Sequence, residues 1–310
     1  MSQKVWLTGS RGFVGRAVGA AFRQAGDQVW GCTNQAVSDA PSGLNENPFV
    51  QLNYLDPGDI KAKVRHFGMP DMFIHSGWAA VDKPESPLHL EENVQASRTL
   101  INTLFGQGLK TFLFIGSMNE YGARTGALAE GMEPDGRLTN YAKAKREAAA
   151  IGFEAAKTFG KAFLHARTFY VYGAGQRPGS LINDLYQASL TGAEVSLSPC
   201  EHYRDYIHVS EVAEGLRRLS TVRESATVNF GSGTVVQVRD FVLLLWKALG
   251  GDLHKLKFGA RKVGWDEPEQ PRSYADLTRL KQLINWTPSL TLQQGVTRTV
   301  ENLRLAGNLR

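Results

Sequence analysis

The chain has 310 residues, of which 42% are hydrophobic and 21% are charged, a composition typical of a globular protein with a well-buried core. Its net charge of +5 comes from scattered basic residues, so we expect an anionic small-molecule ligand rather than nucleic acid. No membrane span, signal peptide, disulfide framework or metal-ligand spacing is visible, so we expect a cytoplasmic protein with no metal site.

The first half of the chain alternates short apolar runs with helical patterns. Strands are predicted, in chain order, at residues 5–8, 28–33, 49–52, 72–75, 111–116 and 162–167. Helices are predicted at about 12–24, 88–105 and 141–158. This alternation predicts an α/β fold of the Rossmann type, in which helices cover a doubly wound parallel sheet.

After residue 173 the pattern loosens, and we expect a smaller α/β substrate domain that covers the cofactor sheet. Helices are predicted at 180–190, 236–249 and 290–305, an extended segment at 202–209 and a loop at 264–273. The predicted domains are residues 1–173 for the cofactor and residues 174–310 for the substrate. A segment of about 203–230 is expected to return to the first domain.

Two short motifs carry the chemistry. Gly9, Gly12 and Gly15 follow the first predicted strand, and this spacing lets a strand turn sharply into a helix whose N-terminus approaches a dinucleotide pyrophosphate. Tyr141 and Lys145 lie four residues apart on one helix face, where an ammonium can lower the pKa of a phenol. The first motif suits a nucleotide cofactor, and the second suits acid–base catalysis.

With these motifs in this order, the chain resembles the extended short-chain dehydrogenase/reductase family over nearly its whole length. The resemblance is to the nucleotide-sugar, NAD-dependent epimerase/dehydratase-like branch, closest to reductases of nucleotide-activated 4-keto-6-deoxyhexoses. The segments that carry it are TGSRGFVG (8–15), IHSGW (74–78), ENV (92–94), GSMNEYG (116–122), YAKAK (141–145), RTFYVYG (167–173), YRDYIHV (203–209) and LINWTP (283–288).

The resemblance implies a catalytic set of Ser117, Tyr141 and Lys145. The Tyr141 phenol would exchange a proton with the substrate oxygen while a nicotinamide carries the hydride. The Ser117 hydroxyl would bond the same oxygen, and Lys145 would hold the ribose hydroxyls. The alternatives are a surface Tyr–Lys pair and a serine that merely ends a buried strand.

The two residues after Ser117 narrow the reaction. The family's 4,6-dehydratases carry Asp-Glu there, and epimerase-reductases of the fucose type carry a Cys at the second place. Here the places hold Met118 and Asn119, whose side chains transfer no proton at neutral pH. Simple hydride transfer at one carbon is therefore favoured over elimination of water.

The resemblance also bears on the cofactor. NAD-specific members end the second strand with a carboxylate that binds the adenosine ribose, but here the strand runs into Asn34. Arg11 resembles the basic residue that contacts the 2′-phosphate of NADP, although it could also be a solvated loop arginine. NADP is therefore the expected cofactor, with NAD possible.

Further cofactor contacts are implied by position. Asn53 and Tyr54 would cradle adenine, the backbone of Ser76 and Gly77 would line the cofactor, and Phe169 would abut the nicotinamide. The full predicted set is Gly9, Arg11, Gly12, Phe13, Val14, Gly15, Asn34, Asn53, Tyr54, Ser76, Gly77, Asn93, Tyr141, Lys145 and Phe169. His75 is expected to be an interior histidine with satisfied hydrogen bonds.

Four residues are predicted to bind the substrate, namely Asn119, Glu120, Arg204 and Arg272. Arg204 would grip the diphosphate of a nucleotide sugar, or could instead pair with Asp205, and Arg272 would take a second phosphate role. Glu120 could reach the sugar or be a solvated loop acid. Tyr170 stands where many relatives have an Asn that contacts the phosphates, so this contact departs from the family pattern.

The expected function is NADPH-dependent reduction of a 4-keto group on a nucleotide-activated 6-deoxyhexose. One alternative is a nucleotide-sugar 4-epimerase with tightly bound NAD, because the same three catalytic residues suffice for it. The other is a regulatory dinucleotide-binding protein without catalysis. The helices at 88–105 and 141–158 match those that form a dimer interface in the family, so a homodimer is expected.

Overall fold

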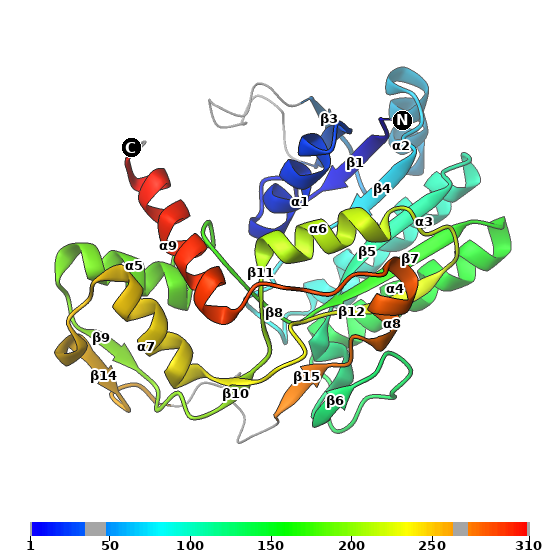
Figure 1. Ribbon diagram of the computed structural model, residues 1–310. Coiled ribbons are helices and arrows are strands. Elements are labelled where there is room, and N and C mark those ends of the chain that lie inside the picture. Colours follow the sequence, from blue (N-terminus) through cyan, green and yellow to red (C-terminus); the bar gives the residue numbers. More distant parts are fainter. Residues whose placement is uncertain (1, 35–47, 263–271, 309–310) are drawn as a thin grey trace.

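The computed structural model describes residues 2–34, 48–262 and 272–308 (Figure 1). In this part of the chain a parallel sheet of seven strands reverses its order next to β1, so it is doubly wound. The strands lie in the order β3 (Phe49–Gln51), β2 (Gln28–Thr33), β1 (Lys4–Thr8), β4 (Met72–His75), β5 (Thr111–Ser117), β7 (Ala162–Thr168) and β12 (Ala226–Phe230). The predicted Rossmann-type α/β fold is therefore confirmed.

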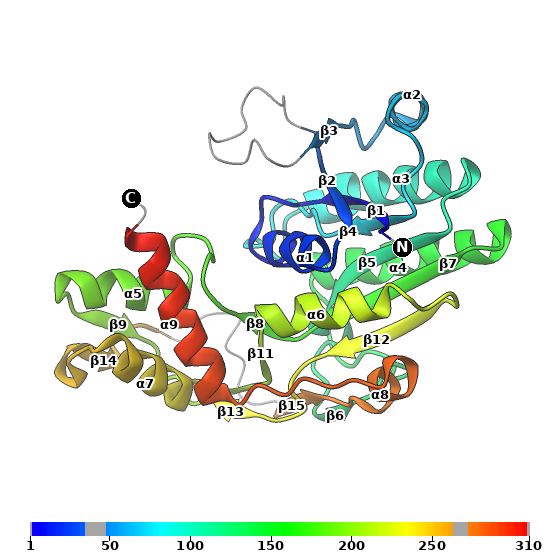
Figure 2. The same ribbon diagram turned by 45° about the horizontal axis from the view of Figure 1, so that its top comes forward.

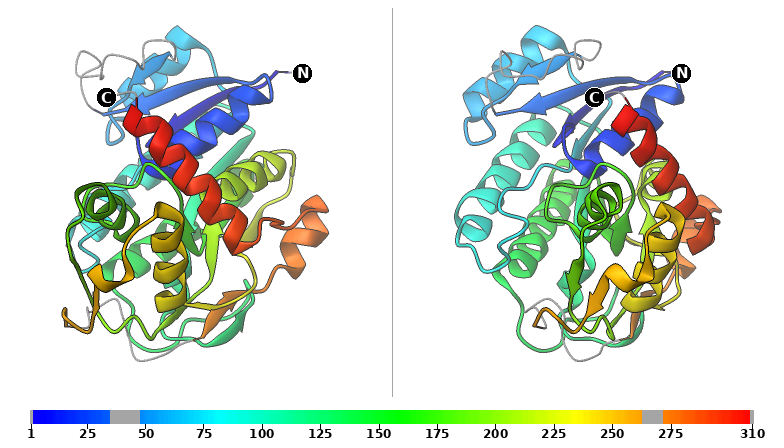
Figure 3. Two further views of the ribbon diagram at one scale, coloured as in Figure 1. Left: turned by 60° about the vertical axis from the view of Figure 1, so that its left-hand side comes forward. Right: turned by 90° about the vertical axis from the view of Figure 1, so that its left-hand side faces the viewer.

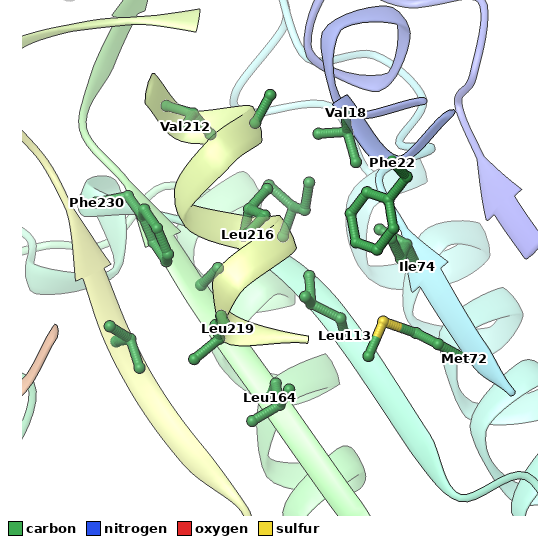
Figure 4. Packing of buried hydrophobic residues seen from close by; sticks show 14 of the residues in the cluster. Val18, Phe22, Met72, Ile74, Leu113, Leu164, Val212, Leu216, Leu219 and Phe230 are labelled. Carbon is green, nitrogen blue, oxygen red and sulfur yellow. The ribbon is translucent and has the colours of Figure 1, made fainter. Parts of the chain in front are cut away.

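Alternate residues of each central strand face opposite sides of the sheet. Val5 and Leu7 of β1 belong to a core shared with α1 (Phe13–Gln24) and α6 (Val209–Leu219), whereas Trp6 belongs to the core on the other side. Figure 4 shows the first core, where side chains of both helices meet those of the sheet. Because both faces of the sheet are buried, the central strands are held firmly in place, and their carboxyl ends carry the candidate active site described below.

The second core packs aromatic rings of the sheet against alanine side chains of one helix and larger apolar side chains of two others. It lies under three helices, α2 (Pro57–Phe67), α3 (Val94–Gly106) and α4 (Asn140–Phe159). A Cβ on Gly152 of α4 would lie 2.1 Å from the Phe163 ring of β7, so only glycine permits this approach. The close packing brings the first turns of α4 beside the carboxyl end of β5.

A smaller α/β portion lies beside the sheet (Figure 2). Its core is built on α5 (Leu181–Thr191), α7 (Val238–Leu249) and α9 (Leu292–Asn308). α9 runs from this portion toward α1 (Figure 3). Residues of α1 and α6, together with Asn302 of α9, line one groove. The short strand pairs are β6 (Gly126–Leu128) with β15 (Ser273–Ala275), β8 (Tyr170–Tyr172) with β11 (Tyr206–His208), β9 (Val195–Leu197) with β14 (Leu256–Phe258) and β10 (Tyr203–Arg204) with β13 (Val236–Gln237).

Several elements were not predicted from the sequence, namely α2, α6, β12 and α8 (Thr278–Ile284). β12 pairs with β7 and α6 contacts α1, so residues 209–230 lie with the main sheet. The predicted helix at 88–105 begins with a π-helical turn, η2 (His89–Asn93). Most of the loop predicted at 264–273 lies outside the described residues. Among the described residues, every helix is too short or too polar to cross a membrane.

Candidate active site

The glycine loop forms a tight cradle between β1 and α1. Gly9 has a φ of +67°, and a Cβ on it would lie 2.7 Å from the backbone nitrogen of Gly77. A Cβ on Gly15 would lie 2.1 Å from the carbonyl oxygen of Gly9. The N-cap of α1, Gly12, provides no side-chain hydrogen bond to the helix. A helix N-terminus without a side-chain cap, behind a tight loop built on glycines, fits a dinucleotide pyrophosphate.

Arg11 lies within this loop, with its Cζ 4.9 Å from the centroid of the Phe49 ring. Its Nε and Nη2 atoms are buried and have no hydrogen-bond partner among the described residues. Phe13 and Val14 are half-buried at the start of α1, and Asn34, after β2, is exposed. Buried donors without partners are rare, so the guanidinium suits an anionic group of a bound ligand.

Other predicted cofactor residues follow β3 and β4. The Gly77 N–H donates to the Thr8 hydroxyl at 2.9 Å, which holds Ser76 and Gly77 against the glycine loop. The Tyr54 hydroxyl donates to a main-chain carbonyl of β2 at 2.8 Å, and Asn53 is exposed. These residues lie where sequence analysis expected the cofactor, and their contacts with it stay a prediction.

Two further predicted cofactor residues are engaged inside the protein. Asn93 clamps the main chain of Ala79, because its Oδ1 accepts from the N–H at 3.1 Å and its Nδ2 donates to the carbonyl at 3.2 Å. Phe169 is 4% exposed and packs against Tyr121 in a small core. Both side chains shape the walls of the site.

The structure brings the three predicted catalytic residues together at the carboxyl end of β5. Thr139 caps α4, Tyr141 lies in the first turn and Lys145 lies one turn further on. The Tyr141 phenol lies close enough to the side chain of Ser117, which ends β5, for the two groups to interact. The Lys145 Nζ donates to the carbonyl of Ile115 at 2.8 Å. A phenol, a hydroxyl and an ammonium thus meet at the carboxyl end of β5. We call the place formed by Ser117, Tyr141 and Lys145 the catalytic edge of the sheet.

The Tyr141 phenol holds its proton firmly. Burial raises its pKa to about 12, although the interaction with Ser117 lowers it, and the Glu120 carboxylate raises it further. The expectation that Lys145 lowers this pKa is not met, since its Nζ lies 5.8 Å from the centroid of the Tyr141 ring and points to the main chain of β5. At neutral pH Tyr141 is therefore a proton donor.

Lys145 is 3% exposed and sits among aromatic rings. Its Nζ lies 3.7 Å from the centroid of the Trp78 ring and 4.8 Å from that of Phe114. Burial lowers its pKa to about 7, while the Glu120 carboxylate raises it. Such a shift, caused by desolvation at a sheet edge, is typical of functional sites.

Glu120 lies beneath the catalytic residues in η3 (Met118–Tyr121) and is 0% exposed. Its Oε1 accepts from the Ser117 N–H at 2.8 Å and lies 3.1 Å from the His165 Nε2, and its Oε2 accepts from the Arg167 Nε at 3.0 Å. Burial alone would raise its pKa, but these partners lower it to about 2. The carboxylate is therefore neither a solvated loop acid nor open to a sugar, and it instead fixes the main chain of Ser117.

His75, at the end of β4, is an interior histidine, as expected. Its Nδ1 lies 2.8 Å from the Thr8 hydroxyl and its Nε2 lies 3.2 Å from the Ser97 hydroxyl. Burial lowers its pKa to about 3, and the nearby Lys145 lowers it further, so the ring is neutral. It joins the end of β1 to the first turn of α3.

The predicted phosphate-binding arginines lie on aromatic rings. The Cζ of Arg204 lies 4.4 Å from the centroid of the Tyr170 ring, and that of Arg272 lies 4.3 Å from the centroid of the Tyr203 ring. The alternative pairing of Arg204 with Asp205 is wrong, because Asp205 accepts from main-chain N–H groups of a nearby turn and of β15. Tyr203 and Arg204 are neighbours in β10, so both arginines lie at this strand.

Several residues that shape the site had no role predicted from the sequence, namely Trp78, His89, His165 and Arg167. Each lies within or next to a motif that the sequence shows, but its contacts depend on the packing of separate elements. Asn119, in contrast, is exposed next to Ser117, so its predicted contact with substrate is sterically open and stays a prediction.

The part of the chain that forms the main sheet and the catalytic edge matches a known protein family. Residues 5–231 match the model of the NAD dependent epimerase/dehydratase family. The chain belongs to this family. The epimerase/dehydratase assignment makes the protein an enzyme of oxidoreductase type, as the sequence predicted. NAD dependence is the family's property, and the preference for NADP stays a prediction.

Individual relatives of this family member have related activities. The chain is 21% identical to UDP-glucuronate 4-epimerase of Thermodesulfobacterium geofontis over 98% of both proteins. It is 25% identical to dTDP-6-deoxy-L-talose 4-dehydrogenase (NAD(P)(+)) of Kitasatospora kifunensis, covering 94% of this chain and 93% of that enzyme. The structure of UDP-glucose 4-epimerase with UDP-glucose from Thermotoga maritima superposes with a TM-score of 0.85 at 21% identity, covering 97% and 99% of the two chains.

These matches cover the smaller α/β portion as well as the main sheet, so the similarity extends over both parts of the chain. The relatives named act at C4 of a nucleotide-linked hexose by their printed names, but they divide between epimerases and a dehydrogenase. The predicted similarity to reductases of 4-keto-6-deoxyhexoses is not decided by these relatives and stays a prediction.

Proposed function

We propose that this epimerase/dehydratase-family enzyme reduces the 4-keto group of a nucleotide-activated 6-deoxyhexose. The observation that carries the proposal is the meeting of Ser117, Tyr141 and Lys145 at the end of β5, beside the glycine cradle. Met118 and Asn119 follow Ser117, so no acid–base pair for loss of water stands at these places. This set supports proton transfer to a single oxygen.

The chain's own residues account for the proton chemistry. The Tyr141 phenol, protonated at neutral pH, would donate its proton to the developing C4 oxygen, and the Ser117 hydroxyl would donate a hydrogen bond to the same atom. Lys145, one turn along α4, would hold the ribose hydroxyls of the dinucleotide. When bound, a nicotinamide dinucleotide supplies the hydride. A protonated phenol is the state from which reduction of a ketone begins.

We further propose NADP as the preferred cofactor. The two buried Arg11 nitrogens that lack partners among the described residues suit a 2′-phosphate, and the exposed Asn34 puts no carboxylate at the end of β2 to repel one. The relative from Kitasatospora kifunensis is named as accepting NAD or NADP. Arg11→Ala should weaken binding of NADPH at least about tenfold and binding of NADH little, as measured by calorimetry.

The substrate would be a nucleotide diphosphate sugar held between the two portions. Arg204 and Arg272 would bind the diphosphate and Asn119 would face the sugar. We also expect a homodimer through α3 and α4. Their outward face carries an ion pair, Arg98 with Glu147 at 3.4 Å, so an interface there would be polar rather than apolar.

A nucleotide-sugar 4-epimerase is the second candidate. It is supported by the match with UDP-glucuronate 4-epimerase over 98% of both chains. Epimerisation needs the same phenol, hydroxyl and ammonium, because a hydride leaves C4 and returns to it. The two candidates differ in how the cofactor is used, since a reductase consumes it and an epimerase regenerates it.

Absorbance of the nicotinamide ring separates these functions. The purified protein is incubated with NADPH or NADH and a panel of dehydratase-generated nucleotide 4-keto-6-deoxy sugars, and absorbance at the reduced nicotinamide band is followed. We expect stoichiometric loss of NADPH. Release of tightly bound NAD from the purified protein, with interconversion of UDP-sugars in the absence of added cofactor, would instead establish the epimerase. Cofactor binding with no turnover of any sugar would leave a regulatory protein.

A further inference from the structure

The loop after β4 places an indole ring over a buried charge. The Nζ of Lys145, 3% exposed, lies 3.7 Å from the centroid of the Trp78 ring and donates one hydrogen bond, to the Ile115 carbonyl at 2.8 Å. An ammonium over an indole face is attracted by the ring quadrupole, and the attraction is strongest when the charge is desolvated. The indole therefore contacts the charged group itself.

The indole is held in place from within the fold. Its Nε1 donates to the His89 Nδ1 at 3.1 Å, so the His89 Nε2 carries the ring hydrogen and donates to the Lys83 carbonyl at 3.0 Å. Asn93 clamps the main chain of Ala79, the residue after Trp78, through two hydrogen bonds. His89 and Asn93 both belong to η2, and π-helical turns are frequent at functional sites. Two residues of one turn thus set the position of the ring.

We propose that Trp78 is a positioning residue that keeps the Lys145 ammonium charged and directed at the catalytic edge. The proposal rests on the proposed role of Lys145 in the same site. Burial lowers the pKa of Lys145 to about 7, and the Glu120 carboxylate is the group that opposes this shift. Because an aromatic face attracts the ammonium and not the neutral amine, the indole holds Lys145 in its charged form.

The other groups that face Lys145 are fixed. Glu120 approaches from η3 as a carboxylate, and its negative charge stabilises the ammonium. His75 approaches from β4 as a neutral ring, and Tyr141 lies one turn back along α4 as a neutral phenol. The Phe114 ring of β5 adds a weaker aromatic contact at 4.8 Å. Replacing Trp78 removes the closest ring contact and leaves these groups in place.

The pKa of Lys145 can be measured directly on the full chain without substrate or cofactor. Lysine labelled with ¹³C at Cε is incorporated, the Lys145 signal is assigned with Lys145→Arg, and its shift is followed with pH. Trp78→Leu keeps apolar bulk but removes the aromatic face, whereas Trp78→Phe keeps a smaller face. The matched control is Trp30→Leu, because Trp30 lies 4.9 Å from Nζ of Lys4 in a similar contact far from the catalytic edge.

We expect Trp78→Leu to lower the pKa of Lys145 by about one pH unit, Trp78→Phe to lower it less, and Trp30→Leu to leave it unchanged. His89→Leu, which removes the acceptor of the indole N–H, should shift it in the same direction as Trp78→Leu. An unchanged titration in both Trp78→Leu and His89→Leu, or an equal shift in Trp30→Leu, would overturn the proposal. The titration involves no turnover, so its failure is distinct from a failure of the proposed reaction.

Discussion

The catalytic edge of the sheet and the arginine-bearing strand β10 hold charge in opposite ways. At the catalytic edge, Glu120 and Lys145 are 0% and 3% exposed, and their polar atoms bond to the protein itself. Around β10, Arg204 and Arg272 lie over tyrosine rings, and Arg272 is exposed. The first arrangement sets the protonation of Tyr141 and Lys145, and the second places positive charge at the strand where we propose that the diphosphate binds.

This difference separates the expected effects of substitution. A buried charge that loses its partner costs stability or changes the protonation of its neighbours. An arginine held by the face of a ring keeps its charge near the surface, so its loss should weaken ligand binding without changing the catalytic step. Substitutions at the catalytic edge should therefore change turnover, whereas substitutions at β10 should change the affinity for the ligand.

The largest effect is expected at the catalytic edge. Tyr141→Phe removes the proton donor but keeps the ring that packs against Trp78 and His89. Turnover should fall at least about 100-fold, the usual contribution of a general acid, while dinucleotide affinity stays nearly unchanged. Steady-state kinetics and calorimetric titration with NADPH measure the two quantities. Equal activity of the variant and the wild type would remove Tyr141 from the mechanism.

Glu120→Gln tests the buried network beneath the catalytic residues. The amide keeps the shape but leaves Arg167, which is 8% exposed, without its carboxylate partner, so the free energy of unfolding should fall by about 3 kcal/mol. Glu147→Gln, in the exposed pair with Arg98, is the control and should change it by about 0.5 kcal/mol or less. Denaturant titration measures both. Similar losses in the two variants would contradict the role of burial.

The same variant has a pH signature. The pKa of Glu120 is lowered in the folded protein from an ordinary value of 4.5 to about 2. Its stabilising contribution is therefore fully present above about pH 4.5 and is lost as the pH falls toward about 2. The wild type should lose stability over this interval more steeply than Glu120→Gln. Parallel stability curves for the two proteins would show that the carboxylate is not held ionised by its neighbours.

The sequence predicted the parts of this molecule that depend on local spacing. The glycine loop, the strands that appear as short apolar runs, and the Tyr141–Lys145 pair on one helix face all follow from residues close together in the chain. It failed where a group's role depends on distant partners. Glu120 looks like a loop acid in the sequence, and only the packing of β5 against β7 places His165 and Arg167 around it.

The sequence also contained a signal that was missed. α6 is amphipathic, because Val212, Leu216 and Leu219 recur at helical spacing and are buried, whereas its charged residues bond to one another along the outer face. The pKa of Tyr141 was predicted in the wrong direction because the spacing to Lys145 says nothing of burial. Spacing predicts which groups can meet, whereas desolvation decides their protonation.

The smallest effect is expected at β10. Arg204→Leu removes a guanidinium that lies on the Tyr170 ring, so the dissociation constants for UDP and dTDP should rise about tenfold. Arg239→Leu is the matched control, because Arg239 lies on the Phe258 ring, 4.2 Å from its centroid, and has no predicted contact with substrate. Calorimetry measures both variants, and kcat at saturating substrate should stay close to the wild-type value.

If both variants weakened binding equally, the effect would come from net charge rather than from a phosphate contact at β10. If Arg204→Leu lowered kcat instead, the separation between the catalytic edge and the arginine-bearing strand would fail.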